Sequence, residues 1–234
     1  MTFKAAAGGA RPAKNGAGAM RALLIKEIKL SLHPTIPIFL LLSAMLIIPN
    51  YPYYVVFFYT GLAIFFTCLS GRENNDVFYT AMLPVRKIEV VRARIMFAVL
   101  AEAAQLLCAV PFAVLRARLP LPQNSVGMDA NAAFFGLSLV MLGIFNFVFF
   151  TRYYKNILKV GYAFVWASTA MAVYIAAAET CDHVVPFMRD RLDTPDPAYL
   201  SEKLAVLAAG AAIFALLTLA AAAESERSFE RLDL

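Results

Sequence analysis

The chain has 234 residues, of which 61% are hydrophobic and only 16% are charged, and its formal net charge is +5 at pH 7. A soluble domain has about a quarter charged residues. The hydrophobic excess here is gathered into runs close to the roughly 20 residues that span a bilayer. These features indicate an integral membrane protein and exclude a separate soluble catalytic domain, because little sequence remains between the runs.

At the N-terminus, residues 1–19 are rich in Ala, Gly and Lys/Arg and lack the apolar stretch of a signal peptide, so we expect a disordered basic tail. Residues 20–32 follow, with helical spacing that predicts one mostly apolar face. The members of that face are Met20, Leu23, Leu24, Glu27, Ile28 and Ser31. Arg21, Lys26 and Lys29 lie away from it, which predicts a helix in the membrane interface with its basic residues reaching anionic headgroups.

We predict six membrane-spanning segments from the apolar runs. They are residues 34–48, 53–69, 95–115, 132–150, 157–178 and 204–223. The first is short and contains two prolines, and only the tetrapeptide PNYP separates it from the second, so these two are expected to form a helical hairpin. The sixth is rich in Ala and Gly, which permits close approach between helix backbones.

The placement of Lys and Arg predicts the orientation, because cytoplasmic loops carry an excess of these residues. One side of the alternating loops, together with both termini, holds 16 of the 21 basic residues. Both termini are therefore expected in the cytoplasm, in a bacterial-type inner or plasma membrane. On the opposite side, residues 179–203 are more acidic than basic, which suits either a solvated cap or an exit lip for a cationic substrate.

The sequence contains no recognisable catalytic or metal-binding motif. His33 and His183 fall on opposite sides of the membrane in this arrangement, and the three cysteines are scattered without CxxC spacing. A G-x-x-x-x-G-K-[ST] phosphate loop is also absent. We therefore expect no enzyme activity, metal or cofactor in this chain, and no nucleic-acid partner. If ATP drives the protein, ATP and Mg²⁺ must bind to another subunit.

One carboxylate lies inside a predicted span. Glu102 is about two turns into the third span, with Gln105 on the same helical face. An ionisable residue at this depth is by default a functional hypothesis. The alternative is a structural contact, in which Glu102 faces the bundle interior and bonds to Gln105 or to a neighbouring span.

The loop of residues 71–94 opens with GRENNDVFYTAMLPVRK. Asn74, Asn75 and Asp76 favour the start of a helix, residues 77–83 give about two turns, and Pro84 cannot continue them. The expected apolar face of this piece consists of Val77, Phe78, Ala81 and Met82. A helix this short is marginal in water, so we expect either a protein partner or the membrane surface to stabilise it.

The stretch ENNDVFYTAMLPVRKIEVVRAR resembles the intracellular loop of small ABC type-2 transporter permeases, in which a polar lead, a short helix and Leu-Pro-Val precede the third span. MRALLIKEIKL is similar to their interfacial elbow helix, and SERSFERLDL to their cytoplasmic tail. The specific part of the resemblance surrounds Leu83-Pro84-Val85. The basic N-terminal extension and the long acidic outer loop depart from the family pattern and leave the substrate open.

The resemblance implies an all-α membrane protein with six transmembrane helices, an N-terminal elbow helix and a short cytoplasmic coupling helix. Its parts would be a tail at 1–19, a permease domain at 20–223 with the coupling loop 71–94, and a tail at 224–234. It further implies the permease subunit of an exporter, paired as a homo- or heterodimer with a second permease chain and driven by a separate ABC ATPase. The expected substrate is an amphipathic or cationic peptide or a similar hydrophobic compound.

The same resemblance implies which residues contact the ATPase. They are Glu73, Asn75, Asp76, Val77, Phe78, Tyr79, Met82 and Arg86. In this scheme Asp76 caps the coupling helix, its apolar and aromatic side chains fill a groove on the ATPase, and Arg86 contacts acidic or backbone groups.

Two other functional classes stay open at this point. A secondary transporter or ion-conducting protein would use Glu102 as a proton or cation site, although such proteins usually show internal repeats, and the first and last three spans show no convincing one. A membrane anchor that only recruits a cytoplasmic partner is the third class.

Overall fold

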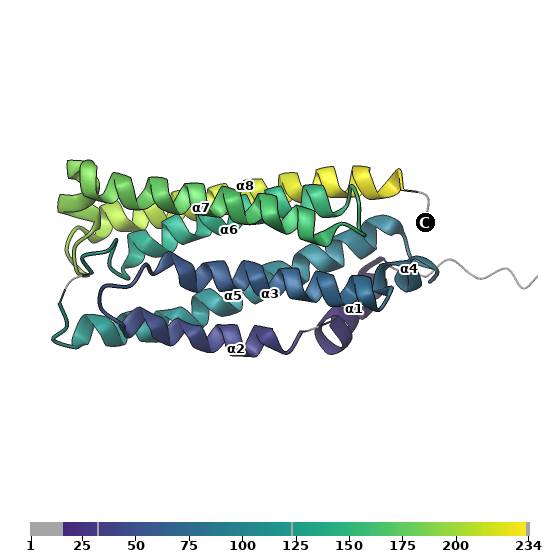
Figure 1. Ribbon diagram of the computed structural model, residues 1–234, viewed down its shortest axis with the longest axis horizontal. Coiled ribbons are helices and arrows are strands. Elements are labelled where there is room, and N and C mark those ends of the chain that lie inside the picture. Colours follow the sequence, from purple (N-terminus) through teal and green to yellow (C-terminus); the bar gives the residue numbers. More distant parts are fainter. Residues whose placement is uncertain (1–15, 32, 123, 233–234) are drawn as a thin grey trace, which may run out of the picture.

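The structure, a computed structural model, describes residues 16–31, 33–122 and 124–232. Every regular element in these ranges is a helix, which confirms the all-α prediction. The long helices lie side by side in an elongated bundle (Figure 1). Helix α1 (Gly16–Lys26), the short helix α4 (Asp76–Ala81) and the C-terminus lie near one end of it. We name this the inner end and the opposite one the outer end, following the predicted orientation.

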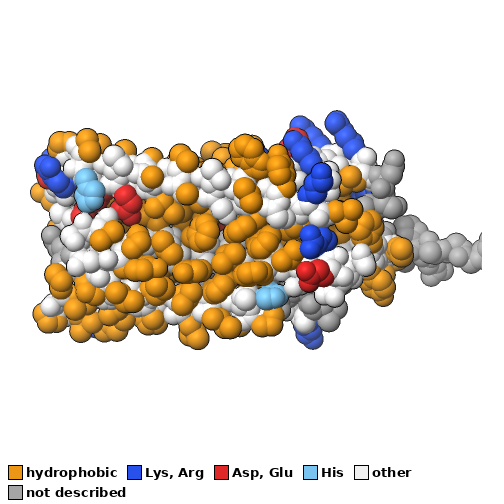
Figure 2. Space-filling model, viewed as in Figure 1, with side chains coloured by type: hydrophobic (Ala, Val, Ile, Leu, Met, Phe, Trp, Pro, Cys, Tyr) orange, Lys and Arg blue, Asp and Glu red, His pale blue; other side chains and the backbone are white. Residues whose placement is uncertain are grey.

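Among the described residues, five helices are long and apolar enough to cross a membrane. They are α3 (Tyr54–Glu73), α5 (Lys87–Arg118), α6 (Ala132–Tyr153), α7 (Val160–Val184) and α8 (Leu200–Glu230). On the face seen in Figure 2, hydrophobic side chains cover the middle of the molecule, and charged side chains gather towards its two ends. The chain is thus a multi-pass helical membrane protein by length and composition.

The first predicted span, residues 34–48, was expected to be short, and it is shorter than the five long helices. It consists of α2 (Thr35–Leu41) and a 3₁₀ helix at Leu42–Ile47, which together form a shorter apolar helix. Its length is roughly 20 Å, against a hydrocarbon core of about 30 Å. The chain still reaches the outer end, where α3 begins beside it (Figure 1), so the expected hairpin is present.

The segments at the inner end extend beyond their predicted limits. Helix α1 starts at Gly16, inside the expected tail, and continues as a π-helical turn at Glu27–Ser31; the tail residues 1–15 lie outside the described residues. Helix α8 runs on to Glu230, so most of the expected C-terminal tail is a continuation of the last span. Phe229 is buried there, its ring centroid 5.3 Å from that of Tyr154.

Helix α6 lies at the centre of the bundle and makes its most extensive contact with α8. A Cβ atom added to Gly210 would collide with the carbonyl oxygen of Gly136, and one added to Gly136 would lie 2.7 Å from the Cα atom of Leu207. The backbones of α6 and α8 therefore touch at two glycines, as is common for helices in membranes, where small residues allow close packing.

Candidate functional site

The short helix α4 is fixed to the inner end by a cluster of four charged residues. Asp76, its first residue, lies 2.5 Å from Lys26 and 2.5 Å from Arg94. Arg94 also pairs with Glu27 at 2.7 Å, and Lys26 pairs with Glu27 at 3.0 Å. The cluster, which we call the inner charge cluster, thus joins α1, α4 and α5 with two acidic and two basic side chains.

The inner charge cluster is largely withdrawn from solvent, since Glu27 is 1% and Arg94 3% exposed. Buried charges are tolerated when they are paired and hydrogen-bonded, and breaking such a pair leaves an uncompensated charge. Gly71 lies directly against this group, because a Cβ atom added there would be 3.3 Å from Nη1 of Arg94. The glycine that opens the GRENND stretch therefore leaves room for the guanidinium.

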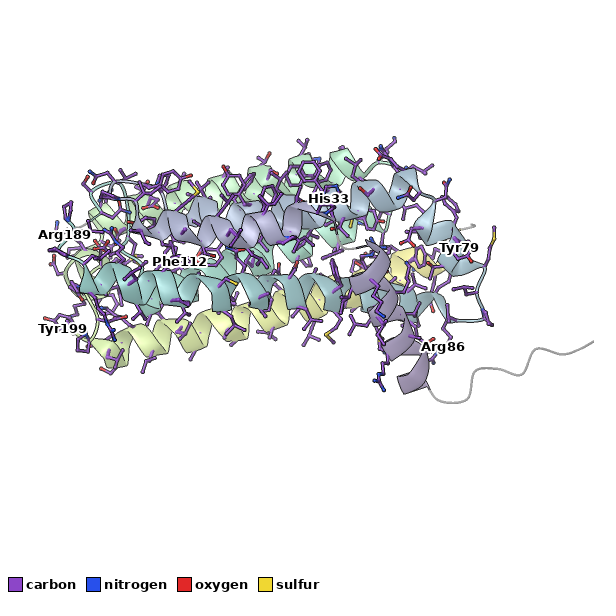
Figure 3. The ribbon with its side chains drawn as sticks, turned by 90° about the horizontal axis from the view of Figure 1, so that it is seen from below. His33, Tyr79, Arg86, Phe112, Arg189 and Tyr199 are labelled. Atoms are coloured by element: carbon purple, nitrogen blue, oxygen red, sulfur yellow. The ribbon has the colours of Figure 1, made fainter. Side chains whose placement is uncertain are left out.

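On the side away from the inner charge cluster, α4 has an exposed surface. Tyr79 is 68% and Met82 83% exposed, and Leu83 is exposed as well. Figure 3 shows Tyr79 at the far inner end, with Arg86 nearby, whereas Arg189 and Tyr199 lie at the outer end. The exposed surface of Tyr79, Met82 and Leu83, which we call the inner tip, is large and apolar for a position at the end of a bundle.

Several residues expected to contact a partner have other contacts in the structure. Val77 is buried and Phe78 packs partly against the core, so the expected apolar face is divided between the bundle and the inner tip. Asp76 makes ion pairs instead of capping α4, and its expected capping role is wrong; the residue before it, Asn75, has φ 52° and forms no side-chain cap. The Asp76 carboxylate faces Lys26 and Arg94, and charge-assisted contacts with such cations are among the strong polar interactions in proteins.

Of the remaining predicted contact residues, Glu73 and Asn75 are exposed beside α4. Arg86 directs its guanidinium to Glu89 of its own chain at 2.8 Å and forms a capping box with it at the start of α5. Its expected acidic contact is therefore already made within the chain, although the Arg86 side chain is still 72% exposed.

Glu102 and Gln105 lie inside the bundle but do not bond to each other, which corrects the first of the two expected contacts. Asn146 of α6 donates a hydrogen bond to Oε2 of Glu102 at 2.9 Å and another to Thr218 of α8 at 3.2 Å. Gln105 donates instead to Ser43, at 2.8 Å. Glu102 is fully buried, so it bonds to a neighbouring span, as the second alternative proposed.

The inner charge cluster was not predicted from the sequence, although two features of the sequence point to it. Glu27 interrupts the apolar face of the α1 segment, and Arg94 lies next to the apolar run of the third span. Each is an isolated charge in an apolar pattern, and buried charges are usually paired. Within the described residues, no three His, Cys, Asp or Glu side chains lie close enough to hold a metal ion.

Comparisons with protein families, curated proteins and solved structures found no match to this chain.

Proposed function

We propose that this chain is the membrane subunit of an ATP-driven exporter, paired with a second permease chain and driven by a separate ABC ATPase that docks on the inner tip. The proposal rests on the sequence resemblance of residues 73–94 and on one structural observation. That observation is an exposed apolar tip on a short helix that is fixed to two other helices by the inner charge cluster.

The exposure of the inner tip favours a protein partner. Exposed apolar side chains that lie together often mark an interaction surface, and a two-turn helix needs support beyond its own hydrogen bonds. Here the support comes from the bundle on one side, through Val77 and Asp76, which leaves Tyr79 and Met82 free for a partner on the other.

The inner charge cluster would couple a movement of α4 to α1 and α5. A displacement of α4 by the ATPase would pull on Arg94 of α5 and on Lys26 of α1, because Asp76 bonds to both. Helix α1 leads into the α2–α3 hairpin, so the hairpin and α5 would move together. Rigid-body movement of packed helices, biased by a ligand bound elsewhere, is a common form of switching. ATP and Mg²⁺ belong to the ATPase in this scheme.

The test is purification of the tagged chain from membranes of its own host. We expect it to bring with it a chain that carries a phosphate loop and hydrolyses ATP. Tyr79→Asp and Met82→Asp should abolish this association, because each adds a charge to the apolar contact. Tyr199→Asp is the matched control, since Tyr199 is an exposed tyrosine at the outer end. Association that survives both inner substitutions would overturn the proposal.

The secondary-transporter alternative depends on Glu102, whose Oε1 is buried without a hydrogen-bond partner among the described residues. The two functions differ in energy source. An exporter accumulates substrate in inside-out vesicles only with ATP, whereas a secondary transporter requires an ion gradient. If no ATPase associates and Glu102→Gln alone abolishes gradient-driven transport, the secondary transporter replaces our proposal. A simple anchor would support neither activity.

A further inference from the structure

A cavity of about 700 Å³ lies at the outer end of the bundle, between α5, α6 and α8. Its walls are mostly aliphatic and aromatic. The apolar lining residues that carry the argument are Leu106, Val110, Val114, Phe135, Leu139 and Leu207. The polar side chains at its outer edge include Arg116, Arg118, Asp129 and Asp196. We call it the outer cavity.

The outer cavity exists because α5 separates from the α6–α8 pair. Helices α6 and α8 are held in backbone contact by Gly136 and Gly210. Helix α5 crosses the bundle obliquely (Figure 1) and contains Pro111 in its interior. A proline inside a helix removes one hydrogen bond and bends the axis. The lining residues Val114 and Arg116 lie just beyond this proline, on the turns that border the cavity.

The polarity of the outer cavity runs along the membrane normal. Leu106 and Arg116 both line it, and ten residues of helix separate them by about 15 Å. This is half of the roughly 30 Å hydrocarbon thickness, so the cavity has the depth of one leaflet. Its apolar part points towards the middle of the membrane and its charged part lies at the outer interface.

Arg116 lines the outer cavity and is held by its own chain. Its Nε and Nη2 atoms donate to Asp129 at 3.1 and 2.8 Å, and Nη2 also donates to the carbonyl oxygen of Pro122 at 3.0 Å. Its Nη1 atom is buried within the protein, and Arg116 as a whole is only 7% exposed. The charge of Arg116 is therefore balanced by Asp129 and not by a molecule in the cavity.

The charge around the outer cavity favours an anion. Arg116 neutralises Asp129, and Lys203 neutralises Asp196 at 2.9 Å. Arg118 makes no ion pair in the part of the chain that the structure describes, which leaves one positive charge at the mouth.

We propose that the outer cavity binds one acyl chain of an anionic membrane lipid, whose headgroup pairs with Arg118 at the mouth. The volume falls in the range of roughly 300–1,000 Å³ that is usual for small-molecule sites. The apolar walls receive the chain, and the exposed Arg118 favours an anionic headgroup over a zwitterionic one. This inference does not depend on the exporter proposal, because lipid binding is measured without an ATPase.

The experiment uses the full chain in a neutral detergent, with two probes that share a 16-carbon chain: lysophosphatidylglycerol, which is anionic, and lysophosphatidylcholine, which is zwitterionic. Native mass spectrometry counts bound lipids, and titration gives each Kd. We expect one anionic lipid to bind with a Kd at least tenfold below that of the zwitterionic one. Equal affinities for the two probes would overturn the proposal.

Two substitutions three residues apart on α5 locate the site. Val110→Trp places a bulky ring in the cavity and should weaken the binding of both probes at least tenfold. Leu107→Trp is the control, because Leu107 is also exposed on α5 but does not line the cavity. If both variants bind alike, the lipid lies elsewhere. If Val110→Trp changes the oligomeric state without changing lipid binding, the cavity receives a second copy of the chain and the proposal fails.

Arg118 gives the second arm of the test. Arg118→Gln removes the positive charge at the mouth from an exposed side chain, so it should bring the two Kd values within about twofold of each other. Arg118→Glu reverses that charge; it should weaken binding of the anionic probe more than tenfold and leave binding of the zwitterionic probe unchanged. Unaltered preference in either variant would contradict the proposal.

Discussion

Asp76 and Arg94 lie 2.5 Å apart, and through this contact the first residue of α4 is joined to the buried inner part of α5. Their pairing explains how a helix of only six residues keeps a fixed position at the end of the bundle. Because Arg94 is also bound to Glu27, and Lys26 to both acids, the removal of any one member leaves three charges that no longer balance.

We expect Arg94→Gln to be strongly destabilising. The substitution leaves the carboxylates of Glu27 and Asp76 with Lys26 as their one shared cation, so one buried negative charge is uncompensated. Losing one partner of a buried pair costs about 3–5 kcal/mol. The double variant Glu27→Gln/Arg94→Gln should lose less stability than the two single variants lose together, because Lys26 and Asp76 remain paired and their charges balance. Thermal unfolding of the detergent-purified variants measures this double-mutant cycle. Strict additivity would show that the cluster is not an energetic unit.

The contact between α6 and α8 predicts that Gly210→Ala is poorly tolerated. The added Cβ atom would collide with the carbonyl oxygen of Gly136, so the two helices must separate. Overpacking of this kind costs about 1–3 kcal/mol, and more where backbone must move. Gly161→Ala is the matched control, since no atom lies within 4 Å of the new Cβ atom there. A melting temperature lowered equally in both variants would argue against the backbone contact.

The five long helices could be predicted from the sequence because each is encoded locally, in a run of apolar residues. The short helix α4 also has local signals, since Asn75 precedes it and Pro84 follows it. The short first span could also be predicted, because its prolines and the tight turn after Ile48 limit its length. Its division into an α-helix and a 3₁₀ helix became evident only from the structure.

The pairings within the candidate site could not be predicted in the same way. Arg94 and Glu27 are 67 positions apart in the sequence, and Glu102 and Asn146 are 44 apart. Which isolated polar residue meets which depends on how the spans pack, and a single sequence contains no local pattern for this. The Ala- and Gly-rich sixth span indicated close packing, but its partner glycine on α6 became evident only from the fold.

The contact between Glu102 and Asn146 predicts that Glu102→Gln is tolerated. A glutamine keeps an oxygen that accepts from Nδ2 of Asn146, and its new amide group supplies a donor beside Oδ1 of Asn146, which is buried without a partner among the described residues. Glu102→Leu removes the acceptor and should cost about 1–3 kcal/mol. In the exporter that we propose, Glu102→Gln also keeps ATP-dependent transport. Unfolding temperature and vesicle transport of both variants check these expectations, and an inactive but stable Glu102→Gln would favour the secondary transporter.

Asp193 predicts how stability changes with pH at the outer end. Burial raises the pKa of Asp193, with a further rise from the nearby Asp129 carboxylate, while the hydrogen bond that it accepts from the Asp129 backbone N–H at 2.7 Å and the charges of His183 and Lys203 act the other way. A carboxyl whose pKa is raised by folding binds protons more tightly in the folded state. Its contribution to stability is therefore fully present below the unfolded pKa of about 3.9 and is lost as the pH rises through the higher folded pKa.

Asp193→Asn should accordingly raise the melting temperature at neutral pH, because the amide oxygen still accepts the hydrogen bond and no charge is buried. It should also remove part of the fall in stability above pH 4. Asp190→Asn is the control: Asp190 is exposed three residues away, and its pKa is lowered by a hydrogen bond from Arg189. Melting curves between pH 4 and 8 test the pair of variants. If Asp193→Asn were less stable than the unmodified protein at neutral pH, the Asp193 carboxylate would be a stabilising charge and the argument from its burial would be wrong.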